Sequence, residues 1–132
     1  MSNTKEFNLY DYKDENNNNE FEKWTKKLQK VEIAKLNLRL DMLKHKGLEL
    51  FPGILTGTPT AGILKLRIKG KTQLRPMLCK GPIDKDNEFT LLIGAIERGS
   101  KFIPSKADET ANARKNKIIK NTTQRCNHAR VN

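Results

Sequence analysis

Three basic residues alternate with apolar ones in the segment 64–69: Lys65, Arg67 and Lys69. The positions between and beside them are apolar: Leu64, Leu66 and Ile68. Because successive side chains of a β-strand point to opposite faces, this pattern predicts a strand with one buried face and one basic face. A row of cations attracts polyanions, so the pattern favours nucleic acid or another phosphate-rich partner. A merely solvated sheet face is the alternative, since exposed faces of antiparallel sheets are ordinarily polar.

The charge of the whole chain agrees with the first interpretation. It has 26 Lys or Arg against 15 Asp or Glu, a net charge of +11 and a pI of about 9.8. Nine basic and only two acidic residues follow Glu97, and no acidic residue lies between Glu49 and Asp84. That acid-free interval holds six basic residues: Lys65, Arg67, Lys69, Lys71, Arg75 and Lys80. A concentrated positive field of this kind is typical of nucleic-acid binding, although solubility alone also explains many basic compositions.

Other chemistries find less support in the sequence. Cys126 and His128 have a C-x-H spacing, but Cys79 and His45 supply no second close pair, so we expect no metal site, no cofactor and no disulfide framework. No nucleotide-binding glycine motif is present. The longest apolar run, 91–96, is far shorter than the roughly 18 residues of a membrane span. We therefore expect a cytoplasmic protein that contacts no membrane.

The elements that must position the basic strand follow from periodicity. Alternation predicts strands over 5–12, 63–69, 74–79 and 88–96, and the last of these is apolar enough to be central. Apolar spacing predicts helices over 20–29 and 31–46, ending at Gly47, and over 105–121, with a capping box formed by Ser105 and Asp108. The expected buried stripes are Phe21, Trp24 and Leu28; Ile33, Leu36, Leu40 and Leu43, with the neighbouring row Val31, Ala34, Leu38 and Met42; and Ala107, Ala111, Ile118 and Ile119.

The remaining segments are predicted to be irregular. Residues 48–62 contain two prolines and three glycines and are expected to form a loop. Pro76 cannot donate a ladder hydrogen bond and is expected at an edge or a bulge. The chain is expected to be a single α+β domain over 1–121, with helices on one face of the sheet, the other face open, and a flexible basic tail over 122–132.

Several segments, in this order, resemble the RelE/ParE superfamily of toxins, in particular its HigB-like, phage-derived branch. They are FNLYDYKDE, FEKWTKKL, the helix that closes in HKG, GILKLRIKGKTQLR, GAIERGSKFIP and ADETANARKNKII. The resemblance covers about residues 6–121. It implies a RelE-like fold with an N-terminal strand, two antiparallel helices, a three-stranded antiparallel meander and a C-terminal helix.

The resemblance also implies an activity and partners. RelE-like and HigB-like toxins are endoribonucleases that cut mRNA, usually on the ribosome, and a small antitoxin neutralises them; here we expect a helix-turn-helix antitoxin. ParE-like relatives poison DNA gyrase instead. By similarity, Lys65 matches the strand lysine of the site, Arg75 the arginine that closes the hairpin, and Arg98 the basic position after the last strand. With Arg67, these are the expected catalytic residues. Further nucleic-acid contacts are expected from Lys69, Lys71, Lys80 and Lys101.

Cleavage through the RNA 2′-hydroxyl needs a base, positive charge near the phosphate and an acid, and it needs no metal. We expect Lys65 to be the base, activated by flanking cations, with Glu97 as a spare carboxylate base. A partly exposed Arg75 and Arg98 would hold the phosphate, because the planar guanidinium donates two parallel hydrogen bonds. These groups are expected to converge on the open sheet face. The alternative is a non-catalytic member of the fold that binds nucleic acid, gyrase or another protein.

Overall fold

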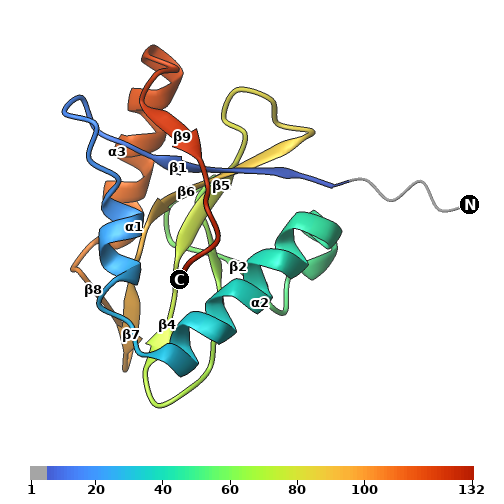
Figure 1. Ribbon diagram of the computed structural model, residues 1–132, viewed down its shortest axis with the longest axis vertical. Helices are drawn as coiled ribbons and strands as arrows, with labels where there is room; N and C mark the ends of the chain where they lie inside the picture. The colour runs from blue at the N-terminus through green and yellow to red at the C-terminus, as the bar shows by residue number, and fades with distance from the viewer. Residues whose placement is uncertain (1–5) are drawn as a thin grey trace, which may run out of the picture.

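The computed structural model describes residues 6–132, and these residues adopt the α+β class that the sequence predicts (Figure 1). Its helices are α1 (Glu20–Thr25), α2 (Lys30–Lys46), the 3-10 helix η1 (Gly47–Leu50) and α3 (Ala107–Lys120). Its strands are β1 (Asn8–Tyr12), β2 (Leu55–Gly57), β3 (Leu64–Leu66), β4 (Gln73–Leu74), β5 (Met77–Lys80), β6 (Glu88–Ile93), β7 (Ile96–Arg98), β8 (Lys101–Ile103) and β9 (Arg125–Asn127). Lys5, where the first strand was expected to begin, lies outside the described residues.

The large sheet has six strands in the order β2-β3-β5-β6-β1-β9. The antiparallel meander of β3, β5 and β6 confirms the sequence prediction. β6 lies inside the sheet and all six of its residues are buried, as expected for the most apolar strand. β1 pairs parallel with β6, from Asn8 opposite Glu88 to Asp11 opposite Leu91, so the sheet is mixed. A bulge separates Met77 from Leu78 directly after Pro76, in agreement with the expected place of this proline.

Helices cover both faces of the sheet, which differs from the one covered face that we expected. Phe21 of α1 and the α2 leucines at positions 36, 40 and 43 form one core with Leu66 and Leu78. On the opposite face, α3 packs over β6, β5 and β1 and forms a second core that includes Met77 and Ile118. β2 and β3 continue the sheet beyond β5 to one edge, and they are not among the strands over which α3 packs. The second face therefore has an open part near β3.

Two regions differ from the predicted elements. The expected loop over 48–62 contains the end of η1 and the edge strand β2, which pairs with β3 from Leu55 opposite Leu66 to Gly57 opposite Leu64. A second, small sheet of order β4-β7-β8 was not predicted at all. Its strands are two or three residues long and mix polar with apolar residues, so they are too short to give a period-two signal.

The helices form where the apolar spacing places them, but their packing differs in detail. Figure 1 shows α1 and α2 diverging from the turn that joins them, and α1 contacts β1 and β6 instead of pairing with α2 as an antiparallel helix. The row of Leu36, Leu40 and Leu43 is buried as expected. The predicted neighbouring row is not a buried one, because Val31 and Leu38 are more than half exposed.

The start of α3 also differs from the prediction. Lys106 occupies the N-cap position with a left-handed backbone (φ 57°), and no side chain caps the helix there. The side chain of Asp108 accepts a hydrogen bond from Thr60 Oγ1 at 2.7 Å instead of closing a capping box with Ser105. Ala107, Ala111 and Ile118 are buried as predicted, whereas Ile119 is exposed.

The C-terminal segment is part of the fold, not the flexible tail expected over 122–132. Strand β9 pairs antiparallel with β1, from Tyr10 opposite Asn127 to Tyr12 opposite Arg125. Beyond it, the backbone of Val131 exchanges two hydrogen bonds with the side chain of Asn37 on α2. The segment was mistaken for a tail because it is polar and short, so its pairing depends on an open edge of β1 that no local pattern reveals. No helix within residues 6–132 is both long and apolar enough to cross a membrane.

Candidate nucleic-acid site beside Glu97

Strand β3 presents the alternation that the sequence predicts. Leu66 and Ile68 are buried in the core beneath α2, and Leu64 packs against the same core. Lys65 and Arg67 point to the opposite face, where both line one hollow. The prediction that one face of this strand is buried and the other basic is confirmed.

This hollow, which we call the Glu97 hollow, has a volume of about 360 Å³. Residues from β2, β3, β4 and β7 contribute to it, so it lies where the two sheets meet. Its lining residues are Thr56, Gly57, Lys65, Arg67, Gln73, Arg75, Glu97 and Gly99. Three cations and one carboxylate give the lining a net positive charge, which suits a phosphodiester.

Glu97 stands between two cations. Its Oε1 atom accepts a hydrogen bond from Arg75 Nε at 2.9 Å and lies 3.6 Å from Lys65 Nζ. The ammonium of Lys65 also lies 4.9 Å from the centroid of the Phe102 ring, a cation–π distance. One quarter of the Glu97 side chain is exposed, against 16% of Lys65 and 6% of Arg75. The carboxylate is therefore held in place by both cations while it still reaches the open hollow.

Arg75 is buried, so the expectation of a partly exposed Arg75 is wrong. Its Nη1 donates to the carbonyl oxygens of Leu74 at 2.8 Å and Ile68 at 3.5 Å, and its Nη2 donates to Gln73 Oε1 at 3.2 Å. With Nε bonded to Glu97, four of the five N–H groups of the guanidinium are in use. The side chain turns into the hairpin that joins β3 to β4 and not toward solvent. Arg75 thus positions Glu97 and cannot hold a phosphate with two parallel hydrogen bonds.

Of the two other predicted arginines, Arg67 lies at the Glu97 hollow and Arg98 does not. The exposed side chain of Arg67 lines the Glu97 hollow, and it makes no hydrogen bond or ion pair with any residue in 6–132. It is the cation that is free to bind a phosphate. Arg98 does not line this hollow. Successive side chains of β7 point to opposite faces, and Glu97 pairs with Phe102 on the side of Lys65, so Arg98 and its neighbour Lys101 lie on the other side.

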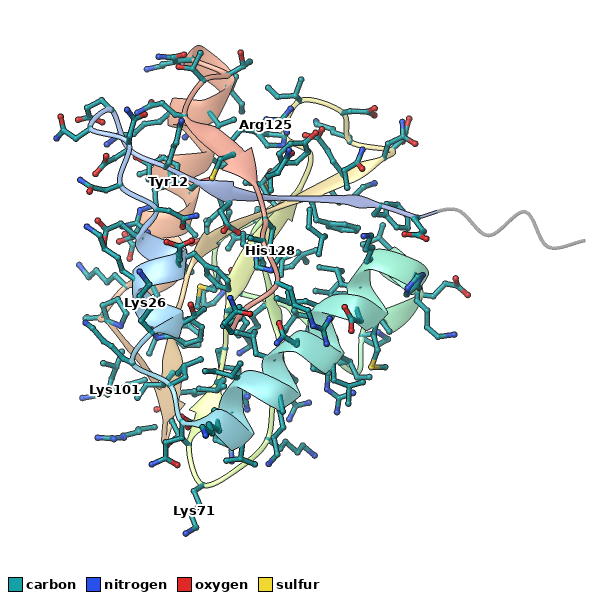
Figure 2. The ribbon with its side chains drawn as sticks, in the orientation of Figure 1. Tyr12, Lys26, Lys71, Lys101, Arg125 and His128 are labelled. Atoms are coloured by element: carbon teal, nitrogen blue, oxygen red, sulfur yellow. The ribbon has the colours of Figure 1, made fainter. Side chains whose placement is uncertain are left out.

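The four lysines predicted to extend nucleic-acid binding are spread over separate surfaces. Lys69 and Lys71 line a second hollow of about 520 Å³, together with Lys35 of α2. Figure 2 shows Lys71 at the tip of a loop, well away from Lys101. Lys80 lines a third hollow beside η1. The structure therefore brings Lys65, Arg67 and Arg75 together, and it does not bring these four lysines to them.

Sequence reasoning missed Gln73 and Phe102, two side chains that contact the predicted cations of the site. Gln73 lies opposite Glu97 in the β4–β7 pairing and binds Arg75, and Phe102 of β8 covers Lys65. Both depend on the small sheet, whose strands were not predicted. The sequence does contain one indication of this site, which is Glu97 itself, an acidic residue directly after the most apolar segment of a basic chain.

A second polar cluster joins the C-terminal segment to the sheet. His128 Nδ1 lies 2.8 Å from Asp11 Oδ1, and both side chains are more than nine-tenths buried (His128 is labelled in Figure 2). Asn19 donates to Asp11 Oδ2 at 2.9 Å and to Cys126 Sγ at 3.6 Å. Burial and the nearby Asp11 raise the pKa of the Cys126 thiol, which favours its protonated form. Each polar group here has a partner within the fold, so the cluster is a structural connection.

Comparison of the chain with protein-family models, curated proteins and solved structures finds no significant match to any of them.

Proposed function

We propose that this protein is a metal-independent endoribonuclease that cuts mRNA at the Glu97 hollow, as a RelE-like or HigB-like toxin of a toxin–antitoxin or phage-derived module does. The observation that carries the proposal is a partly exposed carboxylate, Glu97, held between Lys65 and Arg75 in an open basic hollow. The resemblance of the segments around β1, α2, β3 and β7 to that family supports it. So does the order of strand, two helices, meander and helix.

The geometry supports Glu97 as the general base in place of Lys65. A general base must accept a proton, and Lys65 is engaged as an ammonium by the carboxylate 3.6 Å away. Glu97 would take the proton of the 2′-hydroxyl while the 2′-oxygen attacks phosphorus and the bond to the 5′-oxygen breaks. Lys65 is placed to donate a proton to the departing 5′-oxygen. Arg67 would hold the non-bridging oxygens with its free guanidinium. The products are a 2′,3′-cyclic phosphate and a 5′-hydroxyl.

Induced expression of the chain in a bacterial host tests this function. Wild type should arrest growth and truncate mRNAs within coding regions. Glu97→Gln should relieve both effects, because loss of a positioned general base commonly costs a factor of about 10² to 10⁴ in rate. Arg67→Ala should relieve them partly. The charge-matched control is Lys120→Ala at the exposed end of α3, which should behave like wild type.

Two outcomes would contradict the proposal. If mRNA stays intact while gyrase-dependent DNA breaks accumulate, a ParE-like mode replaces it. If Glu97→Gln remains as toxic as wild type at equal protein level, the hollow is not the site of cleavage.

A second candidate function is RNA binding without cleavage. It is favoured by the mutual pairing of Lys65, Arg75 and Glu97, which satisfies these groups with no substrate present. No Tyr or His lines the hollow to act as a further acid. On this reading the purified protein retains RNA, its affinity falls steeply with salt because each phosphate contact releases counterions, and the RNA stays whole.

A further inference from the structure

A third hollow, which we call the Phe51 hollow, combines exposed apolar side chains with lysines. Its volume is about 470 Å³, and Leu48, Phe51 and Leu64 supply its apolar surface. Phe51 is 49% exposed and Leu48 is 42% exposed. Ile83, which is also 45% exposed, lies in the chain between Lys80 and Lys85, two further lining residues. A group of exposed large apolar side chains at one hollow is a common mark of an interaction site.

The rim of the Phe51 hollow is positive and unpaired. Lys80 comes from the end of β5, Lys85 from the turn before β6 and Lys115 from α3. Within residues 6–132 none of the three ammonium groups forms an ion pair with a carboxylate. Gly62, which also lines the hollow, has φ +83°, a backbone conformation that favours glycine. Among residues 6–132 the three lysines thus have no carboxylate partner, and Leu48 and Phe51 remain exposed beside them.

The Phe51 hollow is distinct from the Glu97 hollow. Leu64 and Lys65 are successive residues of β3, so their side chains point to opposite faces of the sheet. Leu64 packs toward the core beneath α2, whereas Lys65 lines the hollow beside Glu97. The two hollows share no lining residue, so a ligand in the Phe51 hollow need not contact the Glu97 hollow.

We propose that the Phe51 hollow binds an acidic amphipathic segment of a partner protein. The apolar side chains of the segment would enter between Leu48, Phe51 and Leu64, and its carboxylates would reach the three lysines. Charge complementarity selects this occupant. A second copy of the chain carries +11 and would be repelled. A nucleic-acid strand would satisfy the lysines but offers no aliphatic group to cover the two leucines.

Peptide selection on the full chain tests this inference. A display library of random 16-residue peptides is selected on wild type at moderate salt, and the binders are synthesised and titrated against variants. We expect binders that combine Leu, Ile or Phe with Asp or Glu at helical spacing. Phe51→Ser and the double variant Lys80→Glu, Lys85→Glu should each weaken them at least about tenfold, the range of an interface anchor. Leu38→Ser and Lys120→Glu are the matched controls, one exposed leucine on α2 and one exposed lysine on α3, and should change affinity less than about twofold.

Amide shifts of the labelled protein locate the bound peptide. Selected peptides should perturb residues 48–51, 62–64 and 80–85 and leave Thr56, Gln73 and Glu97 unchanged. The inference is overturned if no peptide is enriched, if the enriched peptides are neutral or basic, or if binding survives both variants. It is also overturned if single-stranded RNA shifts 48–51 and competes with the peptides. None of these outcomes depends on RNA cleavage, so the test separates this inference from the proposed function.

Discussion

Replacing Arg75 by alanine should destabilise the fold, although the residue lines the candidate site. The substitution removes a buried guanidinium, 5% exposed, that donates to Glu97, Gln73 and two backbone carbonyls. The carbonyls of Ile68 and Leu74 keep a second partner, because each accepts a backbone N–H from the other residue. Loss of the Arg75 hydrogen bonds to these two carbonyls therefore adds little to the cost in stability.

The expected cost comes mainly from the charged hydrogen bond to Glu97. Such a bond contributes about 1.5 to 3 kcal/mol, and breaking a fully buried ion pair costs about 3 to 5 kcal/mol. Glu97 is one quarter exposed and keeps Lys65 nearby, so we expect the cost to lie at the lower end of the range for a buried ion pair. We expect the free energy of unfolding to fall by about 3 kcal/mol, which lowers the melting temperature by about 10 °C for a chain of this length.

Urea denaturation followed by circular dichroism measures the change, with Arg67→Ala as the matched control. Both arginines line the Glu97 hollow, but within residues 6–132 only the side chain of Arg75 forms hydrogen bonds. Arg67→Ala should change stability by less than about 0.5 kcal/mol. The reasoning is refuted if Arg75→Ala is as stable as wild type, or if both variants lose the same amount.

Three further predictions follow from the packing and the buried groups. Gly94→Ala should cost about 1 to 3 kcal/mol in thermal denaturation, because its Cβ would lie 1.9 Å from Trp24 Cδ2, while Gly57→Ala, with no atom within 4 Å, should be nearly silent. His128→Ala should cost about 1 to 3 kcal/mol and increase hydrogen exchange of the amides of β9, since it leaves Asp11 Oδ1 buried without its partner while Oδ2 keeps the hydrogen bond from Asn19; unchanged exchange would show that the pair does not hold this strand. Burial raises the pKa of Cys79 from 9.0 to about 12, so in the Cys126→Ser variant iodoacetamide should modify Cys79 at pH 8 only as fast as the chain unfolds. From pH 9 to 12 the thiol ionises first in the unfolded chain, so the free energy of unfolding falls with rising pH. Cys79→Ala should lose less stability than wild type over this range, and an equal loss in the two proteins would contradict the prediction.

The sequence patterns predict those parts of the fold that depend on local periodicity. The alternation over 64–69 and the apolar run of β6 predict their strands, and the spacing of Leu36, Leu40 and Leu43 predicts the buried face of α2. The parallel pairing of β1 with β6 and the addition of β9 depend on contacts more than seventy residues apart in sequence, which no local pattern carries.

The same distinction applies to the candidate site. The shared face of Lys65 and Arg67 follows from strand alternation, and the structure confirms it. The burial of Arg75 and its bond to Glu97 depend on the β4–β7 pairing, whose strands of two and three residues are too short to give a strand signal. For the same reason the sequence could not show that Glu97 and Arg98 face opposite sides.

Product analysis with purified protein tests the central claim most directly. Wild type and Glu97→Gln are incubated with a 5′-labelled mRNA fragment in EDTA, with and without ribosomes, after circular dichroism shows that both proteins are folded at the assay temperature. We expect fragments ending in 2′,3′-cyclic phosphate from wild type, and a loss of rate by a factor of about 10² to 10⁴ in Glu97→Gln with RNA binding retained. Equal cleavage by the two proteins, or intact RNA with wild type under both conditions, would contradict it.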